Sequence, residues 1–184
     1  MTIATIPTHQ TALVVQGPGK LTLQNDVSVP LVSDTGTIVK VAAVAINPVD
    51  AKILDFSPAI GAIHGHDFAG TIVALGEHAP AYLALGDRVA GTVHGNNSRE
   101  PSIGAFSEYV AADGDLLLKL PDSMSFEDGA TIGIGLGTAL LCIFQELGLS
   151  GPLYPREPSA DPEFVLVTGG STATGTRTVQ LLKL

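Results

Sequence analysis

Residues 169–175, with the sequence GGSTATG, have the residue types that can hold a phosphate group. They follow four apolar residues at 164–167 (FVLV) and precede a segment that favours a helix. Glycines let the backbone approach a ligand closely, and the first N–H groups of a helix are unpaired at the positive end of its dipole. Ser171, Thr172 and Thr174 add hydroxyl groups. The pattern is typical of a pyrophosphate loop, although an ordinary glycine-rich turn between a strand and a helix has a similar composition.

The loop is a variant of G-x-G-x-x-G in which Thr172 stands at the middle glycine. In a complete dinucleotide-binding fold, a charged residue about 20 positions further on separates NAD from NADP binding. That position lies beyond Leu184, so these residues do not distinguish the two cofactors.

The part of the chain before this loop begins with a sequence pattern that predicts β-strands. Short β-branched or alternating segments, separated by glycine-rich turns, favour a barrel or sandwich. We expect strands at 11–16, 20–24, 37–46, 67–76, 86–93, 104–112 and 116–121, with a turn or short helix at 47–53.

Helical signals follow these strands. Ser125 and Asp128 form a capping-box pattern that predicts a helix start. Gly133, Gly135 and Gly137 predict a break near 132–136 and a second helix at 137–147, with Gly148 as its C-cap. The prolines of 149–163 predict a surface connection.

The composition excludes several kinds of partner. The net charge is −9 and no basic stripe is present, which argues against nucleic acid and anionic membranes as partners. The longest uncharged stretch, 129–145, is shorter than a membrane span. No basic residue precedes Lys20 and Cys142 is the single cysteine, so we expect a reducing, cytoplasmic setting.

Three further stretches stand in order before the loop: AINPVDAK (45–52), GHDFAGTIVALG (65–76) and GDRVAG (86–91). Their order and spacing resemble the medium-chain dehydrogenase/reductase superfamily. AINPVD and GGSTATG look most like the trans-acting enoyl reductases of fungal polyketide synthases. The resemblance implies a fold that is mainly β plus α/β, in which a GroES-like β-barrel precedes the first strand and start of the first helix of a Rossmann domain.

The expected organisation follows from this resemblance. It is a GroES-like catalytic domain at 1–124, connecting helices at 125–148, a proline-rich connection at 149–163 and an incomplete NADPH-binding Rossmann domain at 164–184.

The resemblance implies a zinc-independent member. Zinc-dependent relatives carry a cysteine near the position of Asn47, a His-Glu pair where His66 and Asp67 stand, and a four-cysteine lobe that the segment 93–104 lacks. His64 and His66 have a spacing that ligands can have, but they are also two ordinary histidines at the entrance of a strand. We expect no metal.

The family pattern also implies site residues. Val49, Asp50, Ala51 and Lys52 would line the nicotinamide end of NADPH, and Ser171, Thr172, Ala173 and Thr174 would face its phosphates. Leu136, Gly137, Thr138, Ala139, Leu140, Leu141, Cys142 and Ile143 would form the wall of the acyl pocket. Lys52 and Thr138 are the catalytic candidates. Each assignment has an alternative. Lys52 could be a solvated surface residue and Asp50 a helix cap. The segment 136–143 could be ordinary helix core, in which Cys142 is buried.

The implied activity is transfer of hydride from NADPH to an α,β-unsaturated thioester on the carrier domain of a polyketide synthase, by a monomer. A single βαβ unit takes about 30 residues or more, so we expect a C-terminally truncated chain that is inactive alone. The alternatives are a non-catalytic GroES-like remnant or synthase-binding module and, within the enzymes, an NADPH quinone oxidoreductase.

We predict that the purified chain, prepared without a histidine tag, carries substoichiometric metal, because the cysteine ligands of the usual zinc sites are absent from the sequence. Elemental analysis measures this directly. Stoichiometric zinc would contradict the zinc-independent assignment.

Overall fold

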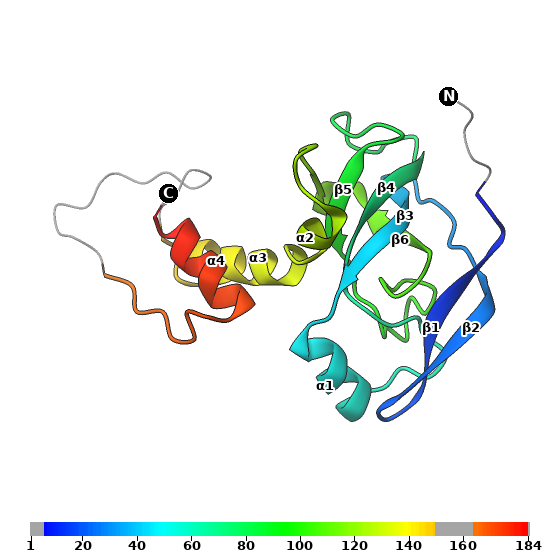
Figure 1. Ribbon diagram of the computed structural model, residues 1–184, viewed down its shortest axis with the longest axis horizontal. Helices are drawn as coiled ribbons and strands as arrows, with labels where there is room; N and C mark the ends of the chain where they lie inside the picture. Colours follow the sequence, from blue (N-terminus) through cyan, green and yellow to red (C-terminus); the bar gives the residue numbers. More distant parts are fainter. Residues whose placement is uncertain (1–5, 150–163, 184) are drawn as a thin grey trace. The chain divides into compact units, whose positions relative to one another are not determined.

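The computed structural model describes residues 6–149 and 164–183. The chain divides into two compact units, Met1–Gly133 and Ile134–Leu184, and each is described by itself (Figure 1). Within the described residues, no helix is both long enough and apolar enough to cross a bilayer. Residues 150–163 of the expected proline-rich connection lie outside the described residues.

The first unit consists mainly of antiparallel strands, as the sequence predicts. Strands β1 (His9–Gly17) and β2 (Lys20–Ser28) form a two-stranded sheet. A five-stranded sheet has the order β6-β3-β4-β5-β7, and its strands are β3 (Gly36–Ala45), β4 (Asp67–Leu75), β5 (Arg88–Thr92), β6 (Tyr109–Asp113) and β7 (Leu117–Lys119). All neighbouring strands are antiparallel.

One predicted strand is shorter than expected. The segment 104–112 predicts a continuous strand, but β6 begins at Tyr109 and is followed by the 3₁₀ turn Gly114–Leu116. The preceding residues pair elsewhere: the Leu13 N–H donates to Phe106 O (2.8 Å) and the Ala105 N–H donates to Gly65 O (3.0 Å). These bonds fasten 104–108 to β1 and to the segment before β4 instead of extending β6.

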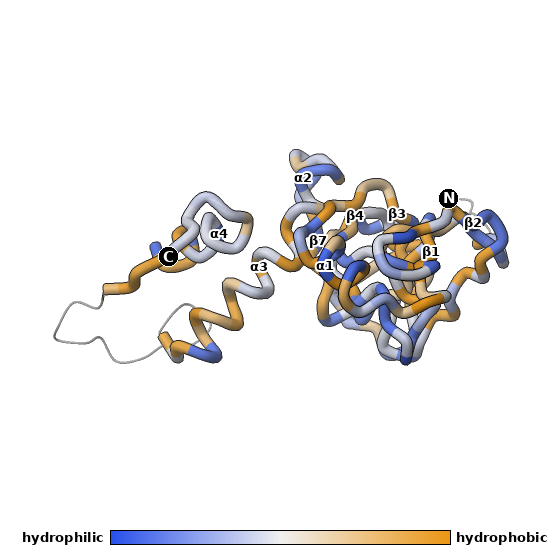
Figure 2. The backbone as a smooth tube through the Cα atoms, turned by 90° about the horizontal axis from the view of Figure 1, so that it is seen from below, coloured by the Kyte–Doolittle hydropathy of each residue, from blue (hydrophilic) through white to orange (hydrophobic). Residues whose placement is uncertain are grey.

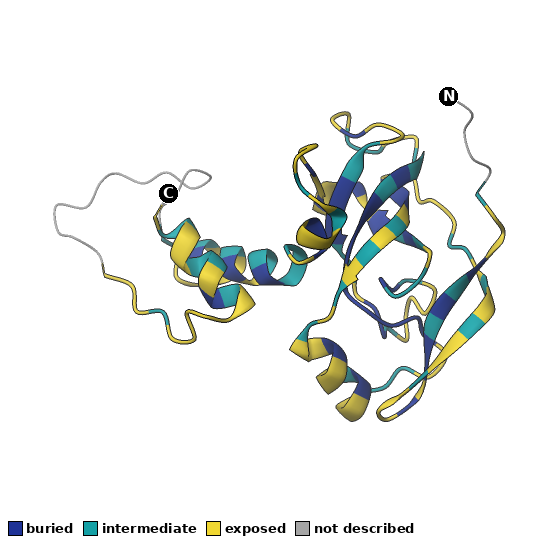
Figure 3. Cartoon of the chain, viewed as in Figure 1, coloured by how far each residue is buried: buried dark blue, intermediate teal, exposed yellow. Residues whose placement is uncertain are grey.

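The core of this unit lies against the five-stranded sheet. Val39, Phe68, Ile72, Val89 and Val110 are all buried in one cluster. Figure 2 shows the hydrophobic colouring that β3 and β4 carry, and Figure 3 shows that much of the surface of α1 is exposed. Alternation of apolar side chains on β-branched strands is sufficient to produce this burial.

Two short helices belong to this unit. Helix α1 (Pro48–Phe56) has proline in its first turn, where the missing N–H is tolerated. Helix α2 (Phe126–Ala130) begins as predicted: the Ser125 hydroxyl accepts the Asp128 N–H (3.0 Å) and donates to the Asp128 carboxylate (2.7 Å). The Arg88 guanidinium lies 4.4 Å from the centre of the Phe126 ring, which links α2 to β5.

The second helix starts earlier than the sequence predicts. Helix α3 (Gly133–Leu140) begins at Gly133 instead of 137 and continues as the π-helical segment η2 (Leu141–Glu146). The glycines serve close contacts here, since a Cβ on Gly133 would collide with the Asp67 carboxylate. A Cβ on Gly135 would lie 3.3 Å from Arg177 Cδ. Gly148 has a φ of 60°, as expected for a C-cap.

Residues 164–167 have no strand assignment, and Val165 and Leu166 are exposed. A strand of a parallel sheet depends on neighbouring strands for its hydrogen bonds, and residues 164–183 contain none to pair with. The helix expected after the glycine-rich loop does form, as α4 (Ala173–Leu181).

We predict that Phe68→Ala lowers the free energy of unfolding by about 3–5 kcal/mol, because the fully buried ring would leave a cavity in the sheet core. Phe56→Ala is the matched control, since Phe56 is 86% exposed at the end of α1. We expect that control to change stability by less than about 0.5 kcal/mol. Urea denaturation followed by circular dichroism measures both; equal losses would contradict the described core.

Candidate functional site

Asp50 is a buried carboxylate in the first turn of α1. The residue is 2% exposed. Its Oδ2 accepts the Asn47 N–H (2.6 Å), and its own N–H donates to Asn47 O (3.0 Å), so Asp50 closes the start of the helix. Its Oδ1 lies 2.5 Å from His66 Nδ1. Asp50 therefore joins the beginning of α1 to the segment that enters β4.

His66 takes part in a network of imidazole rings. It is 6% exposed, and its carbonyl accepts the Val93 N–H (2.9 Å) beside β5. Its ring stacks on His94 with centroids 6.1 Å apart and meets His64 edge-on at 6.4 Å. An ionised carboxylate only accepts hydrogen bonds, so we assign the proton of His66 to Nδ1, which leaves Nε2 as the second functional nitrogen.

His64 is held differently. It is 1% exposed, its Nε2 lies 3.1 Å from the Asp50 carbonyl, and its Nδ1 is buried with no hydrogen-bond partner within the described part of the chain. Phe106 packs edge-on against the ring at 5.6 Å. Burial lowers the pKa of His64 below its ordinary value, with Asp50 opposing this effect and His66 adding to it. His64 is therefore a neutral core residue near neutral pH.

Asn47 ties the start of α1 to β4. Its Nδ2 donates to Asp67 Oδ2 (2.9 Å), and Asp67 is fully buried. Residues 6–149 and 164–183 contain no group of three His, Cys, Asp or Glu side chains that could hold a metal ion. At the position where the resemblance places a ligand cysteine, this chain has an amide that donates to a carboxylate.

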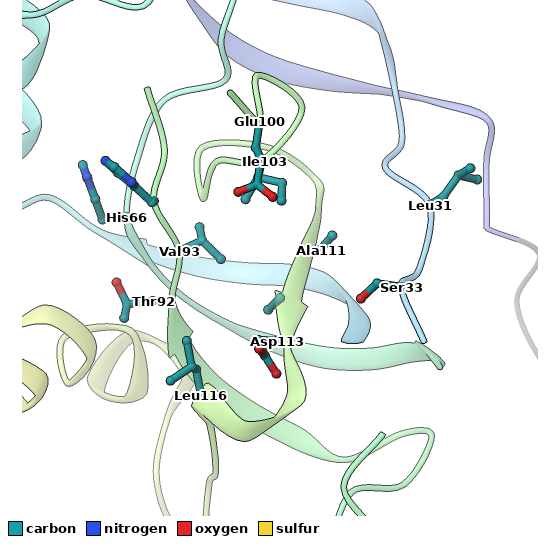
Figure 4. Close-up of a pocket in the computed structure, with 12 residues that line it drawn as sticks. Leu31, Ser33, His66, Thr92, Val93, Glu100, Ile103, Ala111, Asp113 and Leu116 are labelled. Carbon is teal, nitrogen blue, oxygen red and sulfur yellow. The ribbon is translucent and has the colours of Figure 1, made fainter. Parts of the chain in front are cut away.

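A cavity of about 570 Å³ adjoins His66 (Figure 4). Its apolar wall comes from side chains such as Leu31, Val93, Ile103 and Leu116. Its polar groups are those of Ser33, His66, Thr92, His94, Glu100 and Asp113. The cavity thus combines a mainly hydrophobic wall with a few polar residues, among them His66, whose ring is paired behind the wall with the buried Asp50; such a mixture is common in small-molecule sites.

The sequence-predicted nicotinamide residues share the first turn of α1. Val49, Ala51 and Lys52 are exposed, and Asp50 points inward to His66. The structure therefore brings one of the four into the histidine network and leaves three on the surface of the helix.

The glycine-rich loop is shaped by its own hydrogen bonds. Gly169 has a φ of 71°, and a Cβ on Gly175 would collide with the Gly169 carbonyl. The Thr172 hydroxyl accepts the Gly175 N–H (3.0 Å) and donates to Gly169 O (2.8 Å). This hydroxyl, which the sequence suggests as a phosphate donor, is thus engaged as the N-cap of α4. Ser171 and Ala173 are exposed, and Thr174 is half-buried.

The proposed acyl-pocket residues are divided between two faces of a helix. Ala139 and Ile143 are buried, whereas Thr138, Leu141 and Cys142 are exposed. The expectation that Cys142 is buried is wrong, because the register of α3 and η2 turns Ile143 inward in its place. Leu136, Gly137 and Leu140 are intermediate in exposure.

Sequence reasoning missed the pairing of Asp50 with His66. It treated Asp50 as a cap or a cofactor contact and His66 as an ordinary histidine. A usable signal was the placement of His66 beside Asp67 in an apolar run, because a buried histidine needs a hydrogen-bond partner.

Comparison with known proteins agrees with this fold. Residues 33–122 match the alcohol dehydrogenase GroES-like domain. An alcohol dehydrogenase superfamily protein from Novosphingobium aromaticivorans has a similar structure, with a TM-score of 0.76 and 25% identity, over 93% of this chain and 49% of that one. Residues 33–122, within the first unit, therefore match the GroES-like domain that the sequence predicts.

Curated proteins of higher sequence identity are trans-enoyl reductases. The chain is 60% identical to trans-enoyl reductase caaB of Aspergillus niger, over 97% of this chain and 50% of the relative. It is 58% identical to trans-enoyl reductase traG of Penicillium crustosum, with the same coverage. The chain is thus a relative of the trans-enoyl reductases and spans about half the length of the curated proteins it matches.

We predict that His64 makes stability pH-dependent. Unfolded His64 gains a proton below about pH 6.5, whereas burial lowers the pKa of the folded residue, so the unfolded state binds more protons there. The contribution of neutral His64 to the free energy of unfolding is complete above about pH 6.5. It is lost as the pH falls from there towards the lowered pKa of the folded residue.

Urea titrations at several pH values would measure this. His64→Gln should flatten the decrease in stability below pH 6.5, and His78→Gln, at an exposed histidine, should retain it. An unchanged slope in His64→Gln would contradict the assignment.

Proposed function

We propose that this chain is part of a trans-acting enoyl reductase that uses NADPH to reduce an α,β-unsaturated acyl thioester. The observation that carries the proposal is the 60% identity to a trans-enoyl reductase along 97% of the chain. The proposed partner is a polyketide synthase that presents the acyl group on a carrier domain, in the cytoplasm, to a monomeric reductase.

Each unit, taken by itself, carries residues that we propose contact part of a nicotinamide cofactor. Helix α4 directs its N-terminus towards the exposed loop at Ser171–Ala173, where backbone N–H groups and the helix dipole favour a phosphate. The first turn of α1 offers the exposed Val49, Ala51 and Lys52 to the nicotinamide end. NADPH, in preference to NADH, comes from the family resemblance alone.

The chemistry assigned to this chain is binding and orientation. When bound, the cofactor supplies the hydride. In this proposal Lys52, which is exposed on α1, contacts a ribose hydroxyl, and the buried Asp50 fixes the turn that carries it. Thr138 is the proposed polar contact in the acyl-pocket wall, because its side chain lies on the exposed face of α3. A thioester already polarises the conjugated alkene, so the reaction needs no metal ion.

The decisive experiment compares two proteins. One is the chain itself, and the other is the chain joined at Leu184 to the second half of the Aspergillus niger relative. We expect the chain alone to bind NADPH no more tightly than about millimolar, because residues 164–183 contribute one loop and one helix to the cofactor site. We expect the joined protein to bind NADPH near micromolar affinity and to reduce a crotonyl-type thioester. Calorimetry and the decay of NADPH absorbance measure these two properties.

Substitutions in the joined protein test the role of α1. Lys52→Ala should lower kcat/KM about tenfold, which corresponds to about 1.4 kcal/mol. Lys20→Ala, at the exposed start of β2, is the matched control and should leave kcat/KM unchanged. If the joined protein reduces a quinone but does not reduce the thioester, the result would favour a quinone oxidoreductase. Absence of cofactor binding and of both activities would favour a non-catalytic GroES-like module.

A further inference from the structure

Reduction of an enoyl thioester needs a proton as well as a hydride. The hydride goes to the β-carbon, and the electron pair of the alkene moves to the α-carbon and the thioester oxygen. A proton must then reach the α-carbon. Lys52 and Thr138 are both exposed, so neither is held by the protein core as a buried acid would be.

The pair of Asp50 and His66 has the features of a positioned acid. Both residues are more than nine-tenths buried, and Asp50 Oδ1 lies 2.5 Å from His66 Nδ1. A carboxylate on Nδ1 fixes the orientation and the tautomer of the ring. Histidine is the side chain whose ordinary pKa suits proton transfer near neutral pH.

The other ring nitrogen of His66 is available to a ligand. His66 lines the 570 Å³ cavity, and because Asp50 engages its Nδ1, Nε2 is the ring nitrogen left for a ligand. His64 provides the contrast, because its Nε2 is occupied by the Asp50 carbonyl and its Nδ1 is sealed in the core. Only one of the two neighbouring histidines can therefore exchange a proton with a molecule in the cavity.

The position of Asp50 connects this pair to the proposed cofactor site. Asp50 lies between Val49 and Ala51 in the turn proposed to contact the nicotinamide, so the carboxylate that holds His66 belongs to that same turn. We propose that His66 Nε2 is the proton donor to the α-carbon of the thioester, and that Asp50 is the residue that positions it. This inference rests on the proposed function.

The proton balance is simple. The His66 imidazolium breaks its Nε2–H bond as the new C–H bond forms at the α-carbon, and the electron pair of the enolate becomes that bond. His66 is left as neutral imidazole with the Nδ1 proton held by Asp50. A proton from bulk solvent, relayed by water that enters the emptied cavity, then returns to Nε2. The products are the saturated thioester and the oxidised cofactor.

Several charged and titratable groups surround His66 and would affect the pH profile of turnover. Asp50 faces it from α1, His64 and Asp67 flank it on its own segment, and His94 stacks on it from beyond β5. Glu100 and Asp113 line the same cavity. Asp50 Oδ1 lies 2.5 Å from the ring nitrogen Nδ1, so we expect the removal of this carboxylate to change the profile most.

The first test uses the chain alone and needs no activity. Nitrogen-15 NMR of the histidine rings should show neutral His66 with its proton on Nδ1, and Nε2 as the nitrogen that gains a proton as the pH falls. Asp50→Asn should increase the population of the other tautomer, and Asp50→Glu should restore the wild-type one. Neutral wild-type His66 with its proton on Nε2 would overturn the proposal, whatever the chain's function.

The second test uses the joined protein with an α-methyl enoyl thioester in D₂O. The wild type should deliver deuterium to one face and give one configuration at the α-carbon. His66→Gln should lower turnover about 100-fold and give both configurations, because water then protonates the enolate. Asp50→Asn should lower turnover less and shift the pH profile, and His78→Gln, at an exposed site, should match the wild type.

The outcomes separate the two hypotheses. A His66→Gln protein with unchanged rate and configuration would refute His66 as the donor and leave the enoyl reductase proposal intact. A joined protein that binds no NADPH and reduces no thioester would refute the proposed function, and with it the role of His66 in that reaction. The NMR result would then still decide whether the pair has the described geometry.

Discussion

The buried carboxylate of Asp50 is the interaction on which the arrangement of this site depends. One oxygen closes the first turn of α1 at Asn47, and the other contacts the ring of His66. The backbone carbonyl of Asp50 lies 3.1 Å from His64 Nε2. A buried carboxylate without partners is strongly unfavourable, so its contacts hold α1 and the entrance of β4 together. The exposed residues of that turn are therefore presented at a defined position.

The neighbouring contact between Asn47 and Asp67 gives the same junction a second connection. In the pairing of β3 with β4, Asp67 lies opposite Ala45. Because Ala45 precedes Asn47 by two residues, this register brings the Asn47 amide to the Asp67 carboxylate. Gly133 leaves room for the Asp67 carboxylate. In zinc-dependent relatives, the resemblance places metal ligands at these positions. In this chain the same positions hold one another through hydrogen bonds.

Much of the fold could be predicted from local pattern. The antiparallel strands follow from alternating β-branched segments, α1 from Pro48, the start of α2 from Ser125, and the end of η2 from Gly148. The errors occurred where distant contacts override local preference. Gly133 and Gly135 predict a break, but they accept the close approach of Asp67 and Arg177. Residues 104–108 alternate like a strand, but they bond to β1 and to Gly65.

The sequence by itself determined the kinds of chemistry that the chain can perform: a glycine-rich loop before a helix, an acidic turn in α1, and two histidines beside an aspartate. The tertiary structure alone decided which of these groups meet. Asp50 and His66 are 16 residues apart, and Asn47 and Asp67 are 20 apart. Their contact depends on the register of β3 with β4, including its two irregularities. His64 and His66 are two positions apart and so share one face of an extended segment, which means that no local pattern could have chosen between them.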